Sequence, residues 1–133
     1  MHQRIRTIAA LKSYCEKHIS DLDAVLAKMD EARAKDTLRH FLSSNSAHMQ
    51  VLCVYAHESE RIVKFIGEDT EEEGGAIMTP ERKFEILTDE AKRRVLNLNM
   101  RLTSRSTSIS SNLDEDAERA FWIDLFQALN GGY

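Results

Sequence analysis

The chain has 133 residues, of which 42% are hydrophobic and 30% charged, with one proline, five glycines and a formal net charge of −4. This length and composition predict one globular domain with a single hydrophobic core, and they exclude a disordered tail or a fibrous protein. The small negative charge also argues against a surface that binds nucleic acid nonspecifically.

The cysteines and the apolar segments indicate where in the cell the protein is located. Two cysteines are too few for a disulfide framework, and both lie inside hydrophobic helical patterns, which indicates reduced thiols. No apolar stretch has the length of a signal peptide or of a membrane span. We therefore expect a cytoplasmic protein without a membrane partner.

The first predicted helix covers about residues 4–31. No glycine or proline follows it, so its end is inferred from the loss of apolar residues in DEARAK and from Asp36, a candidate N-cap for the next helix. We prefer a turn near residue 33 to one continuous helix, because a single helix of about 60 residues would leave its apolar stripe in need of a partner chain. That stripe holds a heptad register through Ile5, Ile8, Cys15, Ile19, Leu22, Leu26 and Met29.

The second predicted helix covers residues 36–66 and is the longest apolar pattern in the chain. Its stripe has three polar gaps, at Asn45, His48 and Ser59. Gly67 is expected to end the helix in the left-handed conformation that glycine adopts easily. The apolar positions follow a three-then-four spacing at Leu38, Phe41, Leu52, Tyr55, Ile62 and Ile66.

Residues 67–79 are predicted to form an acidic loop. Its EDTEEEGG stretch contains five carboxylates, a threonine and two glycines. Such residues cannot bury themselves, so we expect a solvated and mobile connection.

The third predicted helix covers residues 80–108 and has the clearest start signal in the sequence. Thr79 can act as N-cap, Pro80 has a backbone angle suited to the first helical position, and Glu81 adds an acid to the first turn. Its end is harder to place, because hydroxyl side chains compete for backbone hydrogen bonds in the serine-rich segment that follows. We expect the end between residues 104 and 111.

The last predicted helix, residues 114–130, is short and is terminated by two glycines. Four helices joined by turns of a few to a dozen residues predict an all-α fold, an up-down antiparallel bundle with three long helices and one short C-terminal helix. The whole chain, residues 1–133, is expected to form this single domain.

A polar layer is predicted midway along the first two helices. If they form a hairpin that turns near residue 33, Cys15 lies at the level of Leu52 and Cys53, Ile19 beside His48, and Lys12 beside Tyr55. This pairing gathers several polar or thiol side chains at one level and predicts that a short crosslinker can join the two cysteines. The layer consists of Cys15, His18, Asn45, His48 and Cys53.

A metal site is the functional alternative at this layer. Cys15, His18, His48 and Cys53 together resemble a zinc ligand set. However, residues 48 and 53 point about 140° apart on a helix, so both cannot face one ion without distortion. We favour a layer that fixes helix register by hydrogen bonding, and no metal or cofactor is expected.

Arg94, Arg101 and Arg105 form a basic stripe beside the apolar seam of the third helix. Arginines in this position usually pair with glutamates of a neighbouring helix, which is our preferred interpretation. The alternative is a site for a polyanion, but no aromatic residues are interleaved for base stacking, so nucleic acid is not the expected partner.

The last helix carries more apolar surface than one contact face needs. Trp122, Ile123 and Phe126 widen its apolar arc beyond the core stripe. These residues either bind a partner or lie in a groove of their own chain. On the first reading we expect a homodimer with Trp122 as its anchor.

No sequence motif specifies a reaction, because there is no glycine-rich phosphate loop and no nucleophile elbow. An enzyme is therefore the minority interpretation. We expect a soluble helical bundle that acts through contacts with a protein partner or with itself, as an adaptor, a regulator or an oligomeric structural component. A bundle that binds a metal or small ligand around His48 is the alternative.

Overall fold

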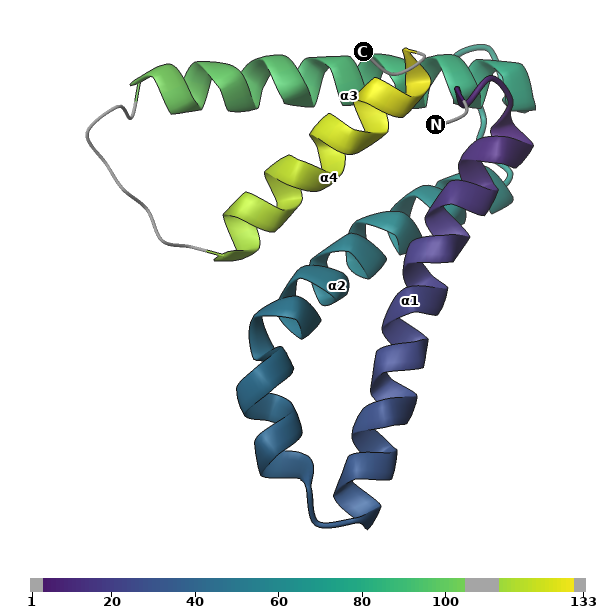
Figure 1. The fold of residues 1–133 in the computed structure, drawn as a ribbon. Coiled ribbons are helices and arrows are strands. Elements are labelled where there is room, and N and C mark those ends of the chain that lie inside the picture. The colour runs from purple at the N-terminus through teal and green to yellow at the C-terminus, as the bar shows by residue number, and fades with distance from the viewer. Residues whose placement is uncertain (1–3, 105–112, 131–133) are drawn as a thin grey trace.

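The computed structural model describes residues 4–104 and 113–130, with residues 98–104 described by their backbone only. Within these ranges the chain forms helices that pack antiparallel, α1 against α2, α2 against α4 and α3 against α4, and no β-strand (Figure 1). The predicted all-α fold is therefore confirmed. The helices are α1 (Ile8–Ala34), α2 (Leu38–Gly67), α3 (Pro80–Ser104) and α4 (Leu113–Leu129).

Threonine hydroxyls begin two of the helices. The Thr79 hydroxyl accepts a hydrogen bond from the Arg82 N–H at 3.1 Å, so the predicted start of α3 at Pro80 is confirmed. The Thr7 hydroxyl likewise accepts from the Ala10 N–H at 3.1 Å and starts α1 four residues later than predicted. α3 reaches Ser104, and the rest of its predicted range lies outside the described residues.

α2 ends at Gly67 as predicted, but the capping role predicted for Asp36 and the conformation predicted for Gly67 are wrong. Asp36 is not an N-cap: it occupies the turn between α1 and α2 with φ 56°, a left-handed conformation that aspartate tolerates better than most residues. Thr37 follows it, and its N–H and hydroxyl both donate to the Ala32 carbonyl, at 2.8 and 3.1 Å. Gly67, the last residue of α2, does not have a positive φ, and Glu68 follows it in an extended conformation with φ −87°.

The acidic connection between α2 and α3 is more regular than predicted. The Met78 N–H donates to the Thr70 carbonyl at 2.7 Å, and the Glu72 N–H donates to the Ala76 carbonyl at 2.8 Å. Gly74 and Gly75, with φ 96° and 83°, reverse the chain between these bonds. The segment is therefore a small antiparallel turn and not the irregular loop that its charge pattern predicts.

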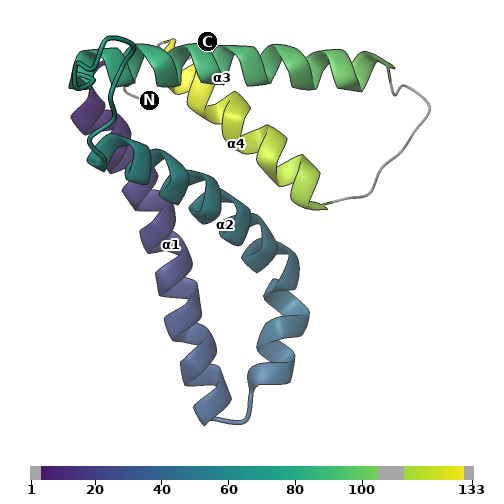
Figure 2. The same ribbon diagram turned by 180° about the vertical axis from the view of Figure 1, so that it is seen from behind.

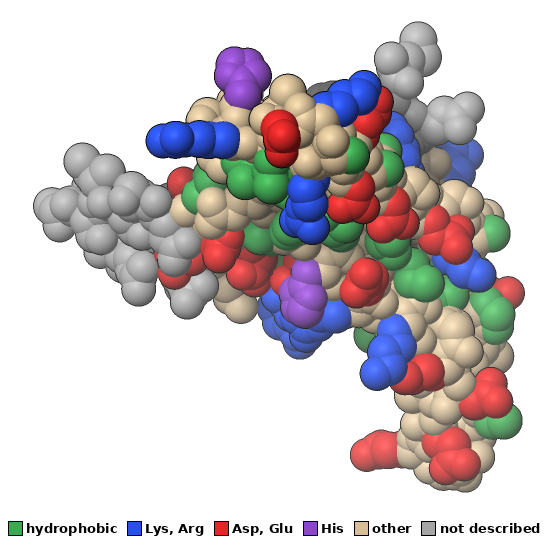
Figure 3. All heavy atoms as spheres, turned by 90° about the horizontal axis from the view of Figure 1, so that it is seen from below, with side chains coloured by type: hydrophobic (Ala, Val, Ile, Leu, Met, Phe, Trp, Pro, Cys, Tyr) green, Lys and Arg blue, Asp and Glu red, His purple; other side chains and the backbone are tan. Residues whose placement is uncertain are grey.

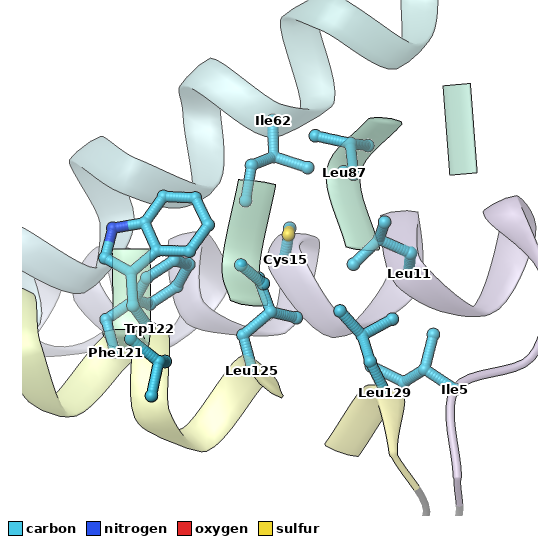
Figure 4. Close-up of a cluster of buried hydrophobic side chains, with 11 residues drawn as sticks. Ile5, Leu11, Cys15, Ile62, Leu87, Phe121, Trp122, Leu125 and Leu129 are labelled. Atoms are coloured by element: carbon cyan, nitrogen blue, oxygen red, sulfur yellow. The ribbon is translucent and has the colours of Figure 1, made fainter. Parts of the chain in front are cut away.

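The hydrophobic core lies at the end of the hairpin where α3 and α4 pack. Figure 4 shows Phe121, Trp122 and Leu125 of α4 meeting Ile62 of α2 and Leu87 of α3. The segment before α1 also joins this core, because the Ile5 N–H donates to the Ala128 carbonyl at 2.9 Å. The buried cluster contains Ile5, Leu11, Cys15, Ile62, Leu87, Ala91, Val95, Phe121, Trp122, Leu125 and Leu129.

The other end of the α1–α2 hairpin projects away from this core. Both ribbon views show α3 and α4 packed at one end of the hairpin, while the turn between α1 and α2 lies at the far end (Figures 1 and 2). We call the projecting part, residues 19–34 and 38–49, the arm. None of the described helices combines the length and the apolar character that crossing a bilayer requires.

Candidate functional site

The apolar side chains of the arm are less covered than those of the core. In the core, Leu11, Phe121 and Leu125 are completely buried. In the arm, only Ala32 counts as buried, although the two helices continue their apolar stripes to the turn. The side chains that remain half-buried there are Ile19, Leu22, Val25, Leu26, Met29, Leu38, Phe41 and Met49.

One flank of the arm is apolar. Ile19 and Leu26 are seven residues apart on α1, as are Leu42 and Met49 on α2, so each pair lies on one face of its helix. We call these four residues the apolar flank. Leu42 is 37% exposed, which is high for a large hydrophobic side chain.

The opposite flank of the arm is polar. It consists of Asp21, Lys28, Ser44 and His48, all of which are exposed. Towards the core this polar flank continues into Tyr55, whose hydroxyl donates to Asp124 of α4 at 3.0 Å. α4 also contacts α2 at Gln50, about 140° around the helix from Tyr55, where the side-chain amide donates to Asp114 at 2.7 Å.

The predicted polar layer is not formed, because the hairpin register differs from the prediction. Tyr55, expected beside Lys12, has its ring 5.1 Å from that of His18. His48 is exposed, and Met49 is half-buried in its place. Asn45 is satisfied within its own helix, since its side-chain amide donates to the Phe41 carbonyl at 2.9 Å.

The four residues of the metal alternative are therefore not brought together. Cys15 is buried near Ser59, His18 is half-buried in an aromatic cluster, and both His48 and Cys53 are exposed. Among the described residues, no three histidine, cysteine, aspartate or glutamate side chains are grouped in a way that could hold a metal ion.

The two thiols should differ sharply in reactivity. Burial raises the pKa of Cys15 to about 12, although the Ser59 hydroxyl acts in the opposite direction, so its thiolate is scarce at neutral pH. We expect iodoacetamide to modify Cys53 in the native protein and Cys15 only after unfolding, as read by mass spectrometry. We also expect no intramolecular crosslink in the native state. A native Cys15–Cys53 crosslink would instead support the register predicted from the sequence.

An aromatic cluster joins α1, α2 and α4 at the base of the arm. The His18 ring makes edge contacts with Tyr14, Tyr55 and Phe121, at centroid distances of 4.8, 5.1 and 5.9 Å. His18 Nε2 is buried and has no hydrogen-bond partner among the described residues. Burial lowers the pKa of His18, an effect that Lys17 reinforces and that Asp21 and Asp124 partly offset. The cluster therefore favours neutral histidine.

Stability should fall on acidification, partly through His18. In the unfolded chain the His18 imidazole binds a proton at about pH 6.5, whereas in the folded protein its lowered pKa means that it binds this proton only at lower pH. The stabilisation is complete above that unfolded-state pKa and is lost as the pH falls through the lower folded-state pKa. Urea unfolding at pH 7.5 and at pH 5 should show a smaller loss for His18→Phe than for the parent. An equal loss in both would contradict this role.

The predicted partner-binding residues of α4 lie against their own chain. Trp122 is only 3% exposed, and its ring packs edge-on against Phe121 at 5.3 Å. Ile123 and Phe126 are half-buried and pack against the same core cluster. The groove interpretation therefore describes α4, and the prediction that Trp122 offers free apolar surface is wrong.

Arg94 of the basic stripe takes part in an ion-pair network. Its Nε donates to Glu90 at 2.7 Å, its Nη1 lies 3.5 Å from Glu118 of α4, and its guanidinium stacks 4.6 Å from the Trp122 ring. This is the pairing expected of an arginine beside a helix seam. The side chain of Arg101 and all of Arg105 lie outside the described residues. Figure 3 shows acidic and basic side chains interspersed on the face seen from below.

A cleft of about 170 Å³ lies beside Arg94, between α2, α3 and α4. Glu58 lines it with a side chain that is only 7% exposed and that lies 3.8 Å from Arg61. The carboxylates of Glu58 and Glu90 are balanced by the two arginines, and the described lining contains no serine, cysteine or histidine. The cleft therefore offers neither a nucleophile nor a strong net charge.

A second hollow, of about 430 Å³, contains the accessible thiol of Cys53 and His57 one helical turn further on. Asp114 and Glu118 of α4 also line it. The described lining of this hollow contains no lysine or arginine.

Lys83 is a structural residue that the sequence analysis missed. Its side chain is buried, and its ammonium donates to the Ile66 carbonyl at 2.9 Å and also to the Glu68 carbonyl. It thereby satisfies carbonyls at the end of α2 that no later turn of that helix can reach. In sequence, one lysine in the first turn of α3 gives no sign of this role.

In comparisons with known proteins, no family model matches the chain, and no similar curated protein or solved structure was found.

Proposed function

We propose that this chain acts through protein contacts and that the arm carries the contact surface. The observation that carries the proposal is the apolar flank of Ile19, Leu26, Leu42 and Met49, whose side chains are half-buried or exposed and lie outside the buried core cluster. In the cell such a protein would serve as an adaptor, a regulator or a structural component of an assembly.

A third layer of structure is what this flank lacks. A helix in a bundle buries an apolar stripe more than 100° wide, and a lone pair of helices covers only the side of each stripe that faces the other helix. Apolar side chains left at the margin are stabilised when a partner removes them from water, at about 25 cal/mol per Å² of apolar surface. Rows of such residues commonly mark interaction sites.

Asn45 of the arm and the two cysteines near its base are compatible with this role. Asn45 is satisfied by a carbonyl of its own helix and needs no ligand. The exposed thiol of Cys53 and the buried thiol of Cys15 are both free, which supports the cytoplasmic location expected from the sequence, because a reducing compartment preserves free thiols.

Site-specific photocrosslinking tests the proposal in the cells that make the protein. Benzoylphenylalanine at position 42 should give a discrete protein adduct, because Leu42 belongs to the apolar flank. The same amino acid at position 77 is the matched control, since Ile77 is more exposed than Leu42, at 61% against 37%, but lies far from the arm in the chain. No adduct from position 42, or equal adducts from both positions, would overturn the proposal.

A further inference from the structure

We propose that His18 forms a pH-sensitive contact at the base of the arm: when it takes up a proton, its ring leaves the aromatic cluster, and α1 loosens there from α2 and α4. The helices and the rest of the core stay formed. This conformational change does not depend on the proposed function, because His18 lies outside the apolar flank and its ring contacts are made within the chain.

Neutral His18 connects three helices. Its ring makes edge contacts with Tyr14 of its own helix, Tyr55 of α2 and Phe121 of α4, at 4.8, 5.1 and 5.9 Å. Its Nε2 atom is buried and has no hydrogen-bond partner within the described ranges. A neutral imidazole carries a proton on only one of its two ring nitrogens, so this surrounding suits the uncharged ring.

Protonation reverses this balance. Both nitrogens of an imidazolium are donors, so the buried Nε2 would then carry an N–H without an acceptor, together with part of a positive charge. A buried charged donor without a partner costs far more free energy than a neutral one. The protonated ring is therefore stabilised by moving to a place where it can be solvated.

The charges around His18 direct the ring outward. Asp21 of α1 and Asp124 of α4 both favour its charged form, and both carboxylates are exposed. Lys17 disfavours that form and is exposed as well. The two tyrosines of the cluster stay neutral, because burial raises the pKa of both hydroxyls. An imidazolium is therefore attracted to carboxylates at the surface and not to a group inside the cluster.

The movement breaks few other contacts. Tyr55 and Phe121 contact each other at 5.4 Å, and the Tyr55 hydroxyl donates to Asp124 at 3.0 Å, so α2 remains joined to α4. α1 loses its His18 ring contacts with both helices. Nearer its N-terminus, α1 stays in the core cluster through Leu11 and Cys15. The change is therefore confined to the level at which the arm begins.

Aromatic NMR spectra of the full chain, recorded from about pH 7.5 to about pH 4.5, test this change. We expect the His18 signals to titrate with a midpoint below 6.5, the ordinary histidine pKa. The nuclear Overhauser effect between the His18 and Phe121 rings should be lost at the same midpoint, and the ring signals of Tyr14 and Tyr55 should shift with it. Far-UV circular dichroism should show the same helix content on both sides of that step.

His18→Phe separates the effect of the proton from that of the ring. It keeps an aromatic side chain in the cluster but cannot titrate, so the tyrosine signals should no longer shift at that pH. The matched control is His57→Phe, which removes an exposed histidine of α2 and should leave the step unchanged. If His18→Phe does not fold, the nuclear Overhauser effect in the parent decides alone.

Different results would overturn the proposal. A His18 midpoint at or above 6.5 would mean that the cluster accommodates the cation. A nuclear Overhauser effect to Phe121 that persists through the titration would mean that the ring stays in place. A loss of helix content at the same midpoint would indicate global unfolding and not a local change. A tyrosine step that survives in His18→Phe, or that disappears in His57→Phe, would assign the step to another group.

Discussion

Replacing Phe121 with alanine should lower the free energy of unfolding by about 3–5 kcal/mol, the usual cost of truncating a fully buried aromatic side chain. Phe121 is completely buried, and its ring contacts Tyr55 at 5.4 Å and Trp122 at 5.3 Å. Its removal would leave a cavity where α1, α2 and α4 meet. Urea unfolding followed by far-UV circular dichroism measures the loss.

Phe126→Ala is the control for this prediction. It removes the same side chain from the same helix, but Phe126 is only half-buried at the edge of the core cluster. Less apolar surface returns to water and the cavity is open to solvent, so we expect less than half the cost of Phe121→Ala. Equal costs at the two positions would place the centre of the core elsewhere.

Local signals in the sequence predicted the helices, because short-range chemistry decides where a helix begins. The hydroxyl of Thr79 and the fixed backbone angle of Pro80 act within one turn, and they start α3 at the predicted residue. The turn at Asp36 and the backbone conformation of Gly67 were less predictable. Several residues can close a turn, and tertiary contacts such as those of Lys83 select among them.

Register between the helices could not be predicted in the same way. A straight α-helix drifts by about 20° per heptad from a 3.5-residue repeat, so over several heptads the contact line passes from one residue to its neighbour. In α2 this drift leaves His48, which was predicted to face α1, exposed, and its neighbour Met49 is half-buried. The turn at Asp36 also lies further along the chain than the predicted turn near residue 33. Both effects separate the residues of the predicted polar layer.

The sequence pattern also could not locate the candidate contact surface. Leu26 and Met29 fit a core stripe, as do Leu38 and Phe41, and the pattern does not say which part of a stripe a third helix covers. That depends on where the shorter α4 packs. Because α4 packs beside the base of the hairpin, residues such as Ile19 and Leu26, which were predicted to be core, are only half-buried in the arm.

Trp122→Ala should lower the free energy of unfolding by about 3–5 kcal/mol without dissociating a dimer. The indole is 3% exposed, packs against Phe121 and stacks on the Arg94 guanidinium at 4.6 Å. Its removal opens a cavity and leaves Arg94 without its aromatic partner. Trp122→Phe keeps a ring for both contacts and should cost less than half as much.

Measuring stability and mass on the same Trp122→Ala sample separates the core role of Trp122 from the anchor role that the sequence suggested. A core residue changes the unfolding midpoint and leaves the mass of the folded protein unchanged, because its contacts lie within one chain. If Trp122 is instead an interface anchor, the Trp122→Ala variant should sediment with half the mass of the parent. At dilutions at which both proteins are monomers, the two should then unfold at the same urea concentration. Since Trp122 is buried within one chain, we expect the first result, and the second would return α4 to the interface.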